Sequence, residues 1–286
     1  MDINEKIILV TGAKGQLGYD IVKEQKKNNI KYIATDSDDL DITNEPKVKS
    51  FFKEHNVSYV IHCAAFTQVD KAEEEKELNY KINVLGTANI VNECKKYDIP
   101  MVYFSTDYIF GGEGDKPYYE DDKANPLGEY AKSKYEGELL VKKLNKYYIV
   151  RISWVFGING NNFIKTMLKL SETKKELNVV SDQIGSPTYT VDLSKLIIDM
   201  IKTDKYGVYH ATNEGFISWS DFAREIFKKA NKNVVVHDVT TEEYNAKAKR
   251  PKNSRLCKDK LVENGFNRLP PWQDALSRFL IELSEN

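Results

Sequence analysis

Thr11-Gly12-Ala13-Lys14-Gly15-Gln16-Leu17-Gly18 follows directly on the apolar run Ile7-Ile8-Leu9-Val10, and this stretch decides the fold. Its glycines are three residues apart, between an expected strand and a helix expected over residues 16–28. Because glycine has no Cβ, Gly12, Gly15 and Gly18 permit a tight turn, a close approach of a pyrophosphate and close packing of the helix on the strand. The unpaired N–H groups at the helix N-terminus attract the anion. Three glycines also occur in ordinary turns, but their position after a strand favours a dinucleotide-binding turn.

The rest of the first half alternates short apolar runs with amphipathic stretches. Strands are expected at residues 32–34, 57–63 and 100–104, and helices after the cap residue Asn44 and over residues 80–96. This alternation predicts an α/β fold of the Rossmann type, a doubly wound parallel sheet covered by helices on both faces. After about Arg151 the strands (near 179–180 and 208–210) are farther apart, with helices expected at 161–173, 190–202 and 218–229. We therefore expect a dinucleotide-binding domain over residues 1–150 and a smaller C-terminal substrate-binding lobe over residues 151–286, with segments that return to the sheet.

The charge and the composition exclude several classes of protein. Among 286 residues, 41% are hydrophobic, 30% are charged, and 42 basic residues balance 43 acidic ones, for a net charge of -1. A nucleic-acid-binding protein or a polybasic membrane binder needs a positive excess. No apolar run approaches the roughly 18 residues of a membrane span, and the first six residues do not resemble a signal peptide. Cys63, Cys94 and Cys257 are scattered, which argues against a disulfide scaffold and a structural metal site. We expect a soluble, reduced, cytoplasmic protein that binds no nucleic acid and no membrane.

Asp36 lies at the expected end of the second strand, 18 residues beyond Gly18. An acid at this place in a dinucleotide-binding fold holds the adenosine ribose hydroxyls and repels a 2′-phosphate. Asp36 therefore favours NADH over NADPH, although Lys14 in the glycine turn can accept a phosphate. The alternative is a solvated loop acid in a run of aspartates.

A Tyr-x-x-x-Lys pattern at Tyr130 and Lys134 indicates a catalytic pair. The pattern is common, since Tyr19 and Tyr119 are also followed by a lysine four residues later. Tyr19 falls inside the first expected helix and Tyr119 in a polar loop. Tyr130 instead opens a helix after a turn, which places it and Lys134 on one face of that helix. The alternative is an ordinary surface helix.

Ser105-Thr106-Asp107 follows the fourth expected strand, at the carboxyl edge of the sheet, where open α/β folds bind ligands. A carbonyl that receives a hydride gains oxyanion character and needs a proton from an acid within hydrogen-bonding distance. A free tyrosine has a pKa near 10. We expect the ammonium of Lys134 to lower the pKa of Tyr130, and the Thr106 hydroxyl to polarise the same carbonyl.

With these motifs placed, the chain resembles an extended short-chain dehydrogenase/reductase and is most similar to the dTDP-4-dehydrorhamnose reductase family. The resemblance covers nearly the whole chain. The glycine turn and the Tyr130–Lys134 pair are signals of the wider superfamily, whereas Val69-Asp70-Lys71-Ala72-Glu73 and Arg250-Pro251-Lys252-Asn253-Ser254-Arg255-Leu256 are more particular. It implies reduction of the 4-keto group of dTDP-4-dehydro-6-deoxy-L-mannose by NAD(P)H to give dTDP-L-rhamnose, a precursor of cell-surface polysaccharide.

The resemblance also implies roles for individual residues. Thr106, Tyr130 and Lys134 are the implied catalytic group, with Tyr130 as proton donor and Lys134 on the nicotinamide ribose. Asp107 and Trp154 are implied contacts of the sugar. The implied cofactor contacts, besides Tyr130 and Lys134, are Gly12, Gly15, Gln16, Leu17, Gly18, Asp36, Asp41, Ile42, Ala64, Ala65, Thr67 and Phe104.

Arginine is scarce, with six against 36 lysines, yet Arg250 and Arg255 lie in one short stretch. A guanidinium fork fits a diphosphate better than an ammonium does, so we assign both to the substrate. The alternative is a surface loop with ordinary charges, and Trp154, on composition alone, is more typical of a core. We assign no metal ligands, and leave open Mg²⁺ dependence and the choice between a monomer and a homodimer.

Two departures from the family pattern lie near the expected cofactor. Phe66 stands where the reductases often carry a histidine, and His62-Cys63 replaces the more usual Asn-Ala. We expect these residues to be buried under the edge of the sheet, so that polarity changes and binding is kept.

Other functions on the same fold are a nucleotide-sugar 4,6-dehydratase, a 4-epimerase and a non-catalytic NAD(P)-binding regulatory subunit. Tyr108 stands where dehydratases commonly carry a glutamate, which argues against elimination. An epimerase is not firmly excluded. The retention of Thr106, Tyr130 and Lys134 together argues against a regulator, which needs no acid.

Overall fold

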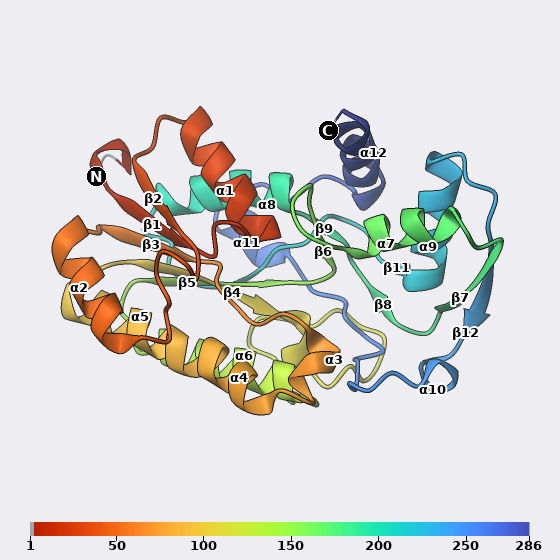
Figure 1. The fold of residues 1–286 in the computed structure, drawn as a ribbon, viewed down its shortest axis with the longest axis horizontal. Helices are drawn as coiled ribbons and strands as arrows, with labels where there is room; N and C mark the ends of the chain where they lie inside the picture. Colours follow the sequence, from red (N-terminus) through yellow and green to blue (C-terminus); the bar gives the residue numbers. More distant parts are fainter. Residues whose placement is uncertain (1–2, 286) are drawn as a thin grey trace.

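Six parallel strands form the central sheet, in the order β10-β5-β4-β3-β1-β2 (Figure 1). The structure is a computed structural model and describes residues 3–285. Residues 1, 2 and 286 lie outside the described residues. Part of the expectation about a signal peptide and the outer bounds of the two expected domains fall on these residues. The strands of the sheet are β1 (Ile8–Thr11), β2 (Tyr32–Thr35), β3 (Tyr59–His62), β4 (Met101–Thr106), β5 (Tyr147–Ile152) and β10 (Gly207–His210). The expected parallel α/β sheet is therefore confirmed.

Helices cover both faces of this sheet (Figure 1). One face carries α1 (Gln16–Lys27), α8 (Thr190–Ile201) and α11 (Asp259–Glu263), and the other carries α2 (Glu45–His55), α5 (Thr87–Lys96) and α6 (Glu129–Val141). Each face has its own apolar core, so β1, β3 and β4 are buried along their whole length. Continuous burial is typical of parallel strands covered on both faces.

The expected helix over residues 80–96 changes its hydrogen-bonding pattern in the structure. It consists of α4 (Lys76–Tyr80), a π-helical segment η2 (Lys81–Gly86) and α5. Within η2, the Asn83 side chain bonds both backbone groups of Phe66, and a Cβ on Gly86 would lie 2.6 Å from Cδ1 of Ile42. Single π-turns inside helices are frequent at functional sites. The π-helical segment η2 is thus hydrogen-bonded through Asn83 to the loop after β3.

Asn44 caps α2 as the sequence predicts. Its side-chain oxygen accepts a hydrogen bond from the Lys47 amide at 3.1 Å, and Pro46 lies in the first turn, where its missing N–H is not needed. The helix therefore begins at a point set by local sequence.

The second half of the chain forms a smaller body beside the sheet (right side of Figure 1) and also completes the sheet with β10. Its own apolar core is built around Phe156, Phe222 and Phe279. Several elements within residues 3–285 escaped the sequence analysis, and the longest strand and the longest helix among them are β5 and the final helix α12 (Trp272–Ser284). The remaining elements are η1 (Ile3–Glu5), α3 (Val69–Ala72), η3 (Asp107–Ile109), β6 (Val155–Phe156), α7 (Phe163–Ser171), β7 (Glu176–Val180), β8 (Ile184–Gly185), β9 (Thr188–Tyr189), β11 (Ile217–Ser218), α9 (Trp219–Lys229), β12 (Val235–Val239) and α10 (Thr241–Tyr244).

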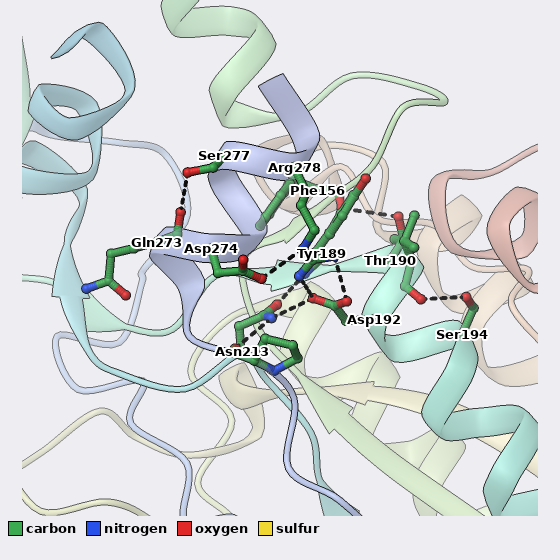
Figure 2. Close-up of polar contacts among 12 residues, drawn as sticks. Phe156, Tyr189, Thr190, Asp192, Ser194, Asn213, Gln273, Asp274, Ser277 and Arg278 are labelled. Atoms are coloured by element: carbon green, nitrogen blue, oxygen red, sulfur yellow. Dashed lines mark hydrogen bonds and ion pairs between the residues drawn. The ribbon is translucent and has the colours of Figure 1, made fainter. Parts of the chain in front are cut away.

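An ion pair between the partly exposed Arg278 and the buried Asp192 joins α12 to α8 (Figure 2). The two Nη atoms of Arg278 donate to Oδ1 and Oδ2 of Asp192 at 2.8 and 2.7 Å, and the Asn213 amide donates to Oδ2 at 2.9 Å. Asp192 is 4% exposed, so its charge needs these donors. No helix within residues 3–285 is long and apolar enough to cross a membrane.

Candidate active site

The glycine turn lies at the point where the strand order reverses, between β1 and β3. Ligands of open α/β sheets bind at such a point, outside the carboxyl ends of the strands. Gly12 has φ +64°, and a Cβ there would lie 2.6 Å from the Ala64 nitrogen. A Cβ on Gly18 would lie 2.3 Å from the Gly12 oxygen, so helix α1 packs directly on the turn. Neither Gly12 nor Gly18 therefore leaves room for a side chain.

The start of α1 suits an anion. Gly15 is the N-cap of the helix and makes no side-chain hydrogen bond to it. The amides of Gln16 and Leu17 begin the first turn, where α-helical N–H groups have no intrahelical acceptor. The turn and these donors fit the pyrophosphate of a dinucleotide.

Loop residues after β3 are held against the turn by buried polar groups. The hydroxyl of Thr11 lies 2.7 Å from Nδ1 of His62 and accepts from the Ala64 amide at 3.3 Å. Burial lowers the pKa of His62 to about 3, so its ring is neutral at physiological pH. Ala64 and Ala65 are half-buried beside the turn, and Thr67 is exposed. Their contact with the nicotinamide half of a cofactor stays a prediction.

Asn83 joins the same loop to helix α6. Its side chain accepts from the Phe66 amide at 2.8 Å and donates to the Phe66 carbonyl at 3.0 Å and the Ser133 hydroxyl at 3.0 Å. Phe66 and His62 are buried as expected, whereas Cys63 is only half-buried. Asn83 and Ser133 were missed by sequence reasoning, because nothing in the periodicity of the helix reveals a π-turn.

Asp36 faces the glycine turn. Its carboxylate accepts from the Lys14 amide at 3.0 Å and from the Ser37 amide at 2.8 Å, while the Lys14 ammonium pairs with Asp38 at 3.1 Å. A hollow of about 380 Å³ beside these residues is lined in part by Asp36 and Lys14. Asp36 is thus ordered at the place expected for the ribose, and Lys14 is already paired.

Asp41, Ile42 and Phe104 lie in different surroundings from Asp36. The Asp41 carboxylate accepts from the amide and the hydroxyl of Thr43 at 2.9 and 2.7 Å. These bonds lower the pKa of Asp41. Ile42 is buried against Gly86, and the Phe104 side chain packs in the core on the α1 side of the sheet. A contact of Phe104 with a cofactor would therefore involve its backbone, and the cofactor roles of all three stay predictions.

Thr106 and Tyr130 meet at the carboxyl edge of the sheet. Thr106 ends β4 and Tyr130 lies in the first turn of α6, with the Tyr130 hydroxyl beside the Thr106 side chain. The Thr106 hydroxyl also donates to Oδ1 of Asp107 at 3.0 Å. Lys134 follows one turn along α6, 5% exposed, with its Nζ 4.2 Å from the centre of the Tyr103 ring. Tyr130 itself is half-buried and lines a small pocket, so it does not point into the core.

Burial dominates the electrostatics of this group. It lowers the pKa of Lys134 to about 7, although the carboxylate of Glu138 acts in the opposite direction. It raises the pKa of Tyr130, and the charge of Asp107 adds to that effect. The expectation that the Lys134 ammonium lowers the pKa of Tyr130 is therefore wrong for this structure, because desolvation of the phenol is the larger effect.

Asp107 and Trp154 lie at the same edge of the sheet. Asp107 is 2% exposed, and burial raises its pKa to about 6. Trp154 lies just after β5 with φ +50°, an uncommon backbone angle for a bulky residue. Its ring stacks on Trp219 with centres 3.6 Å apart, and a Cβ on Gly185 would lie 2.9 Å from its Cε2. Trp154 is thus held rigidly, and its contact with a sugar stays a prediction.

The two arginines that the sequence analysis assigned to the substrate have different partners in the structure. Arg250 forms a two-bond ion pair with Asp70, with Nη1–Oδ1 and Nη2–Oδ2 distances of 3.1 and 2.6 Å. Arg255 donates to the Asn253 side chain at 3.0 Å and lies 5.9 Å from the centre of the Phe216 ring. Asp70 was missed as a site residue, although it falls in a stretch that the sequence analysis singled out. Among the described residues, no group of three or more His, Cys, Asp or Glu side chains is placed to hold a metal ion.

The fold and the Thr106–Tyr130–Lys134 group define a member of the short-chain dehydrogenase/reductase class. The sequence also matches the family described as RmlD substrate binding domain over residues 6–285. The chain belongs to this family.

Named relatives resemble the chain over nearly its whole length. It is 41% identical to the spore coat polysaccharide biosynthesis protein SpsK of Bacillus subtilis, covering 97% of this chain and 98% of that one. It is also 41% identical to a dTDP-4-dehydrorhamnose reductase of Aggregatibacter actinomycetemcomitans, covering 94% and 96%. The crystal structure of a dTDP-4-dehydrorhamnose reductase from Bacillus anthracis in complex with NADP is 44% identical, with a TM-score of 0.94 over 97% of this chain and 99% of that chain.

Proposed function

We propose that this protein reduces the 4-keto group of dTDP-4-dehydro-6-deoxy-L-mannose to give dTDP-L-rhamnose, with NADH or NADPH as the reductant. The observation that carries the proposal is that Thr106 and Tyr130 lie side by side at the carboxyl edge of the sheet, with a glycine turn after the nearby strand β1. The names of the relatives support the same reaction.

Each residue of the group has a role in this reaction. A bound nicotinamide supplies a hydride to C4 of the sugar. The Tyr130 hydroxyl donates the proton that the developing O4 alkoxide takes up, and the Thr106 hydroxyl donates a hydrogen bond to the same oxygen. Lys134 holds the nicotinamide ribose.

The remaining assignments follow from the same reaction. We infer that residues 1–150 bind the cofactor and residues 151–286 the sugar nucleotide, with Asp107 and Trp154 on the sugar and Arg250 and Arg255 on the diphosphate. A nucleotide-sugar enzyme with three free cysteines among its described residues fits the cytoplasm.

We further propose that NADH is preferred over NADPH. Asp36 would lie at the 2′ position of the adenosine ribose, where its charge repels a phosphate, and Lys14 is engaged by Asp38. Asp36→Ala should then raise the ratio of kcat/KM for NADPH to that for NADH by about tenfold, the size of one lost charge–charge contact near the surface. An unchanged ratio would show that Asp36 does not select the cofactor.

The function is tested by following the loss of reduced-nicotinamide absorbance with enzymatically generated dTDP-4-dehydro-6-deoxy-L-mannose. Turnover to dTDP-L-rhamnose, identified by chromatography, supports the proposal, and the uridine analogue reports on which base is read. Tight dinucleotide binding without oxidation would favour the regulatory alternative. Conversion at C4 without net oxidation of the cofactor would favour an epimerase.

A further inference from the structure

Residues 247–252, here called the 247–252 loop, run from the second half of the chain across to α3 in the first half. In Figure 1 this segment, next to α10, passes close to α3. Asp70 on α3 receives three hydrogen bonds from the loop, two from the Arg250 guanidinium and one from the Ala248 amide at 3.1 Å. Lys247 pairs with Glu74 beside them.

The loop forms a wall of the pocket that contains Tyr130. Lys249 and Pro251 line this pocket together with Tyr108, Tyr130 and Val69, and only about 10 Å³ remain between them. That volume holds about one water molecule. The loop therefore lies against the pocket that Tyr130 lines.

A chain of contacts leads from Asp70 to Tyr130. The Arg250 guanidinium is hydrogen-bonded to Asp70 and interacts electrostatically with the Tyr108 hydroxyl. The Tyr108 ring meets the Tyr130 ring edge-on, with centres 6.0 Å apart at 83°. Arg250 is 21% exposed and Asp70 47%, so the pair is shielded on the arginine side.

The opposite side of the loop is fixed by backbone shape. Gly112 has φ +77°, and a Cβ there would lie 2.4 Å from Cα of Pro251. The loop thus packs closely on Gly112 through Pro251 on one side and is held by the Asp70–Arg250 ion pair on the other. The contacts of the loop that depend on charge are this pair, the Lys247–Glu74 pair and the pairs of Lys252 with Asp182 and Glu242.

We propose that Asp70 is a positioning residue of the site, because its carboxylate holds Arg250 and the 247–252 loop against Tyr108 and Tyr130. Asp70 touches neither substrate nor cofactor; it acts through Arg250, which stays oriented for the substrate diphosphate. This second part rests on the proposed function, whereas the holding of the loop does not.

Limited proteolysis tests the loop without any substrate. Trypsin cleaves after Lys247 and Lys249, which are exposed, when the loop opens, and the rate follows the open population. Asp70→Asn keeps the shape and the acceptor for Ala248 but removes the charge, so cleavage in this loop should become about tenfold faster, the scale of a lost charge-assisted bond. The control Glu74→Gln removes the neighbouring exposed pair with Lys247 and should leave the rate within about twofold. Equal cleavage of wild type and Asp70→Asn would overturn the proposal.

Kinetics test the orientation of Arg250. In Asp70→Asn we expect the KM for the sugar nucleotide to rise about tenfold, with kcat changed less than about threefold and the KM for NADH unchanged. A KM that is unchanged or lower would overturn the proposal, since a lower value means that Asp70 competes with the substrate for Arg250. Asp70→Glu keeps the charge, so its cleavage rate and its KM for the sugar nucleotide should lie between those of wild type and Asp70→Asn. If circular dichroism shows that Asp70→Asn is unfolded, Asp70→Glu takes its place in both experiments. Failure of the wild type to turn over would instead reject the proposed function, while the cleavage result would still stand.

Discussion

The guanidinium of Arg151 and the carboxylate of Glu138 form a two-bond ion pair that is closed to solvent, with Nε–Oε1 and Nη2–Oε2 distances of 2.9 and 3.0 Å. Glu138 lies one helical turn after Lys134 on α6, and Arg151 lies on β5. The pair therefore joins helix α6 to strand β5 one helical turn beyond Lys134.

Removing Glu138 should destabilise the fold strongly. Glu138→Gln leaves Arg151 buried with no carboxylate, and breaking a buried pair from one side costs about 3–5 kcal/mol. The free energy of unfolding in urea measures this. As a control, Lys202→Gln breaks the exposed Lys202–Asp199 pair and should cost less than about 1 kcal/mol. Equal costs for the two variants would contradict the role of burial.

The activity should depend on the protonation of Lys134. Its pKa lies at about 7, so the ammonium is present below that pH and is lost as the pH rises through it. If the ammonium is the active form, kcat/KM falls with one proton on the basic side of about pH 7. Because the Glu138 carboxylate raises the pKa of Lys134, Glu138→Gln should move this limb to lower pH. If the basic limb of the profile does not move, the Glu138 carboxylate has no influence on the pKa of the group that controls activity.

Tyr130→Phe should lower kcat by about a hundredfold or more while dinucleotide binding is kept, as is usual for loss of a general acid. Tyr119→Phe is a matched control, because Tyr119 also precedes a lysine by four residues but is 53% exposed in a loop. Its rate should equal that of wild type. If kcat falls by a similar factor in both variants, Tyr130 is not the proton donor.

His62 should make the protein sensitive to acid. Its pKa is about 3 in the folded chain and about 6.5 when unfolded, so between these values the unfolded state binds more protons. Stability then falls as the pH drops from about 6.5 toward 3, with a slope of up to one proton from this residue. His62→Gln keeps a hydrogen-bonding side chain and should reduce the slope of unfolding free energy against pH. The buried His210, whose pKa is also lowered, remains in both proteins and contributes equally.

Local sequence was enough to place the glycine turn and the Asn44 cap, and to predict Tyr130 in a helix and Tyr119 in a loop. Each depends on residues within one turn or one strand of the motif. The π-turn at Asn83 was not predictable, because it is set by the loop at Phe66, which comes from another element. The strand β5 was missed because its inward Arg151 interrupts an otherwise apolar run.

Long-range pairs and burial account for the other differences. Asp70 and Arg250 are 180 residues apart, so their contact is invisible to any reading of spacing. The sign of the pKa shift of Tyr130 follows from how completely the surrounding protein excludes water, which a motif does not record.

The position of β10 has a consequence for synthesis. The strand pairs with β5, yet 54 residues separate the end of one from the start of the other. While the ribosome is still making that intervening stretch, β5 has an unpaired edge, and unpaired edges invite association with other chains. The nascent first half thus stays open to misassembly until residues 207–210 emerge, and a pause in translation before that point should increase aggregation more than a pause after it.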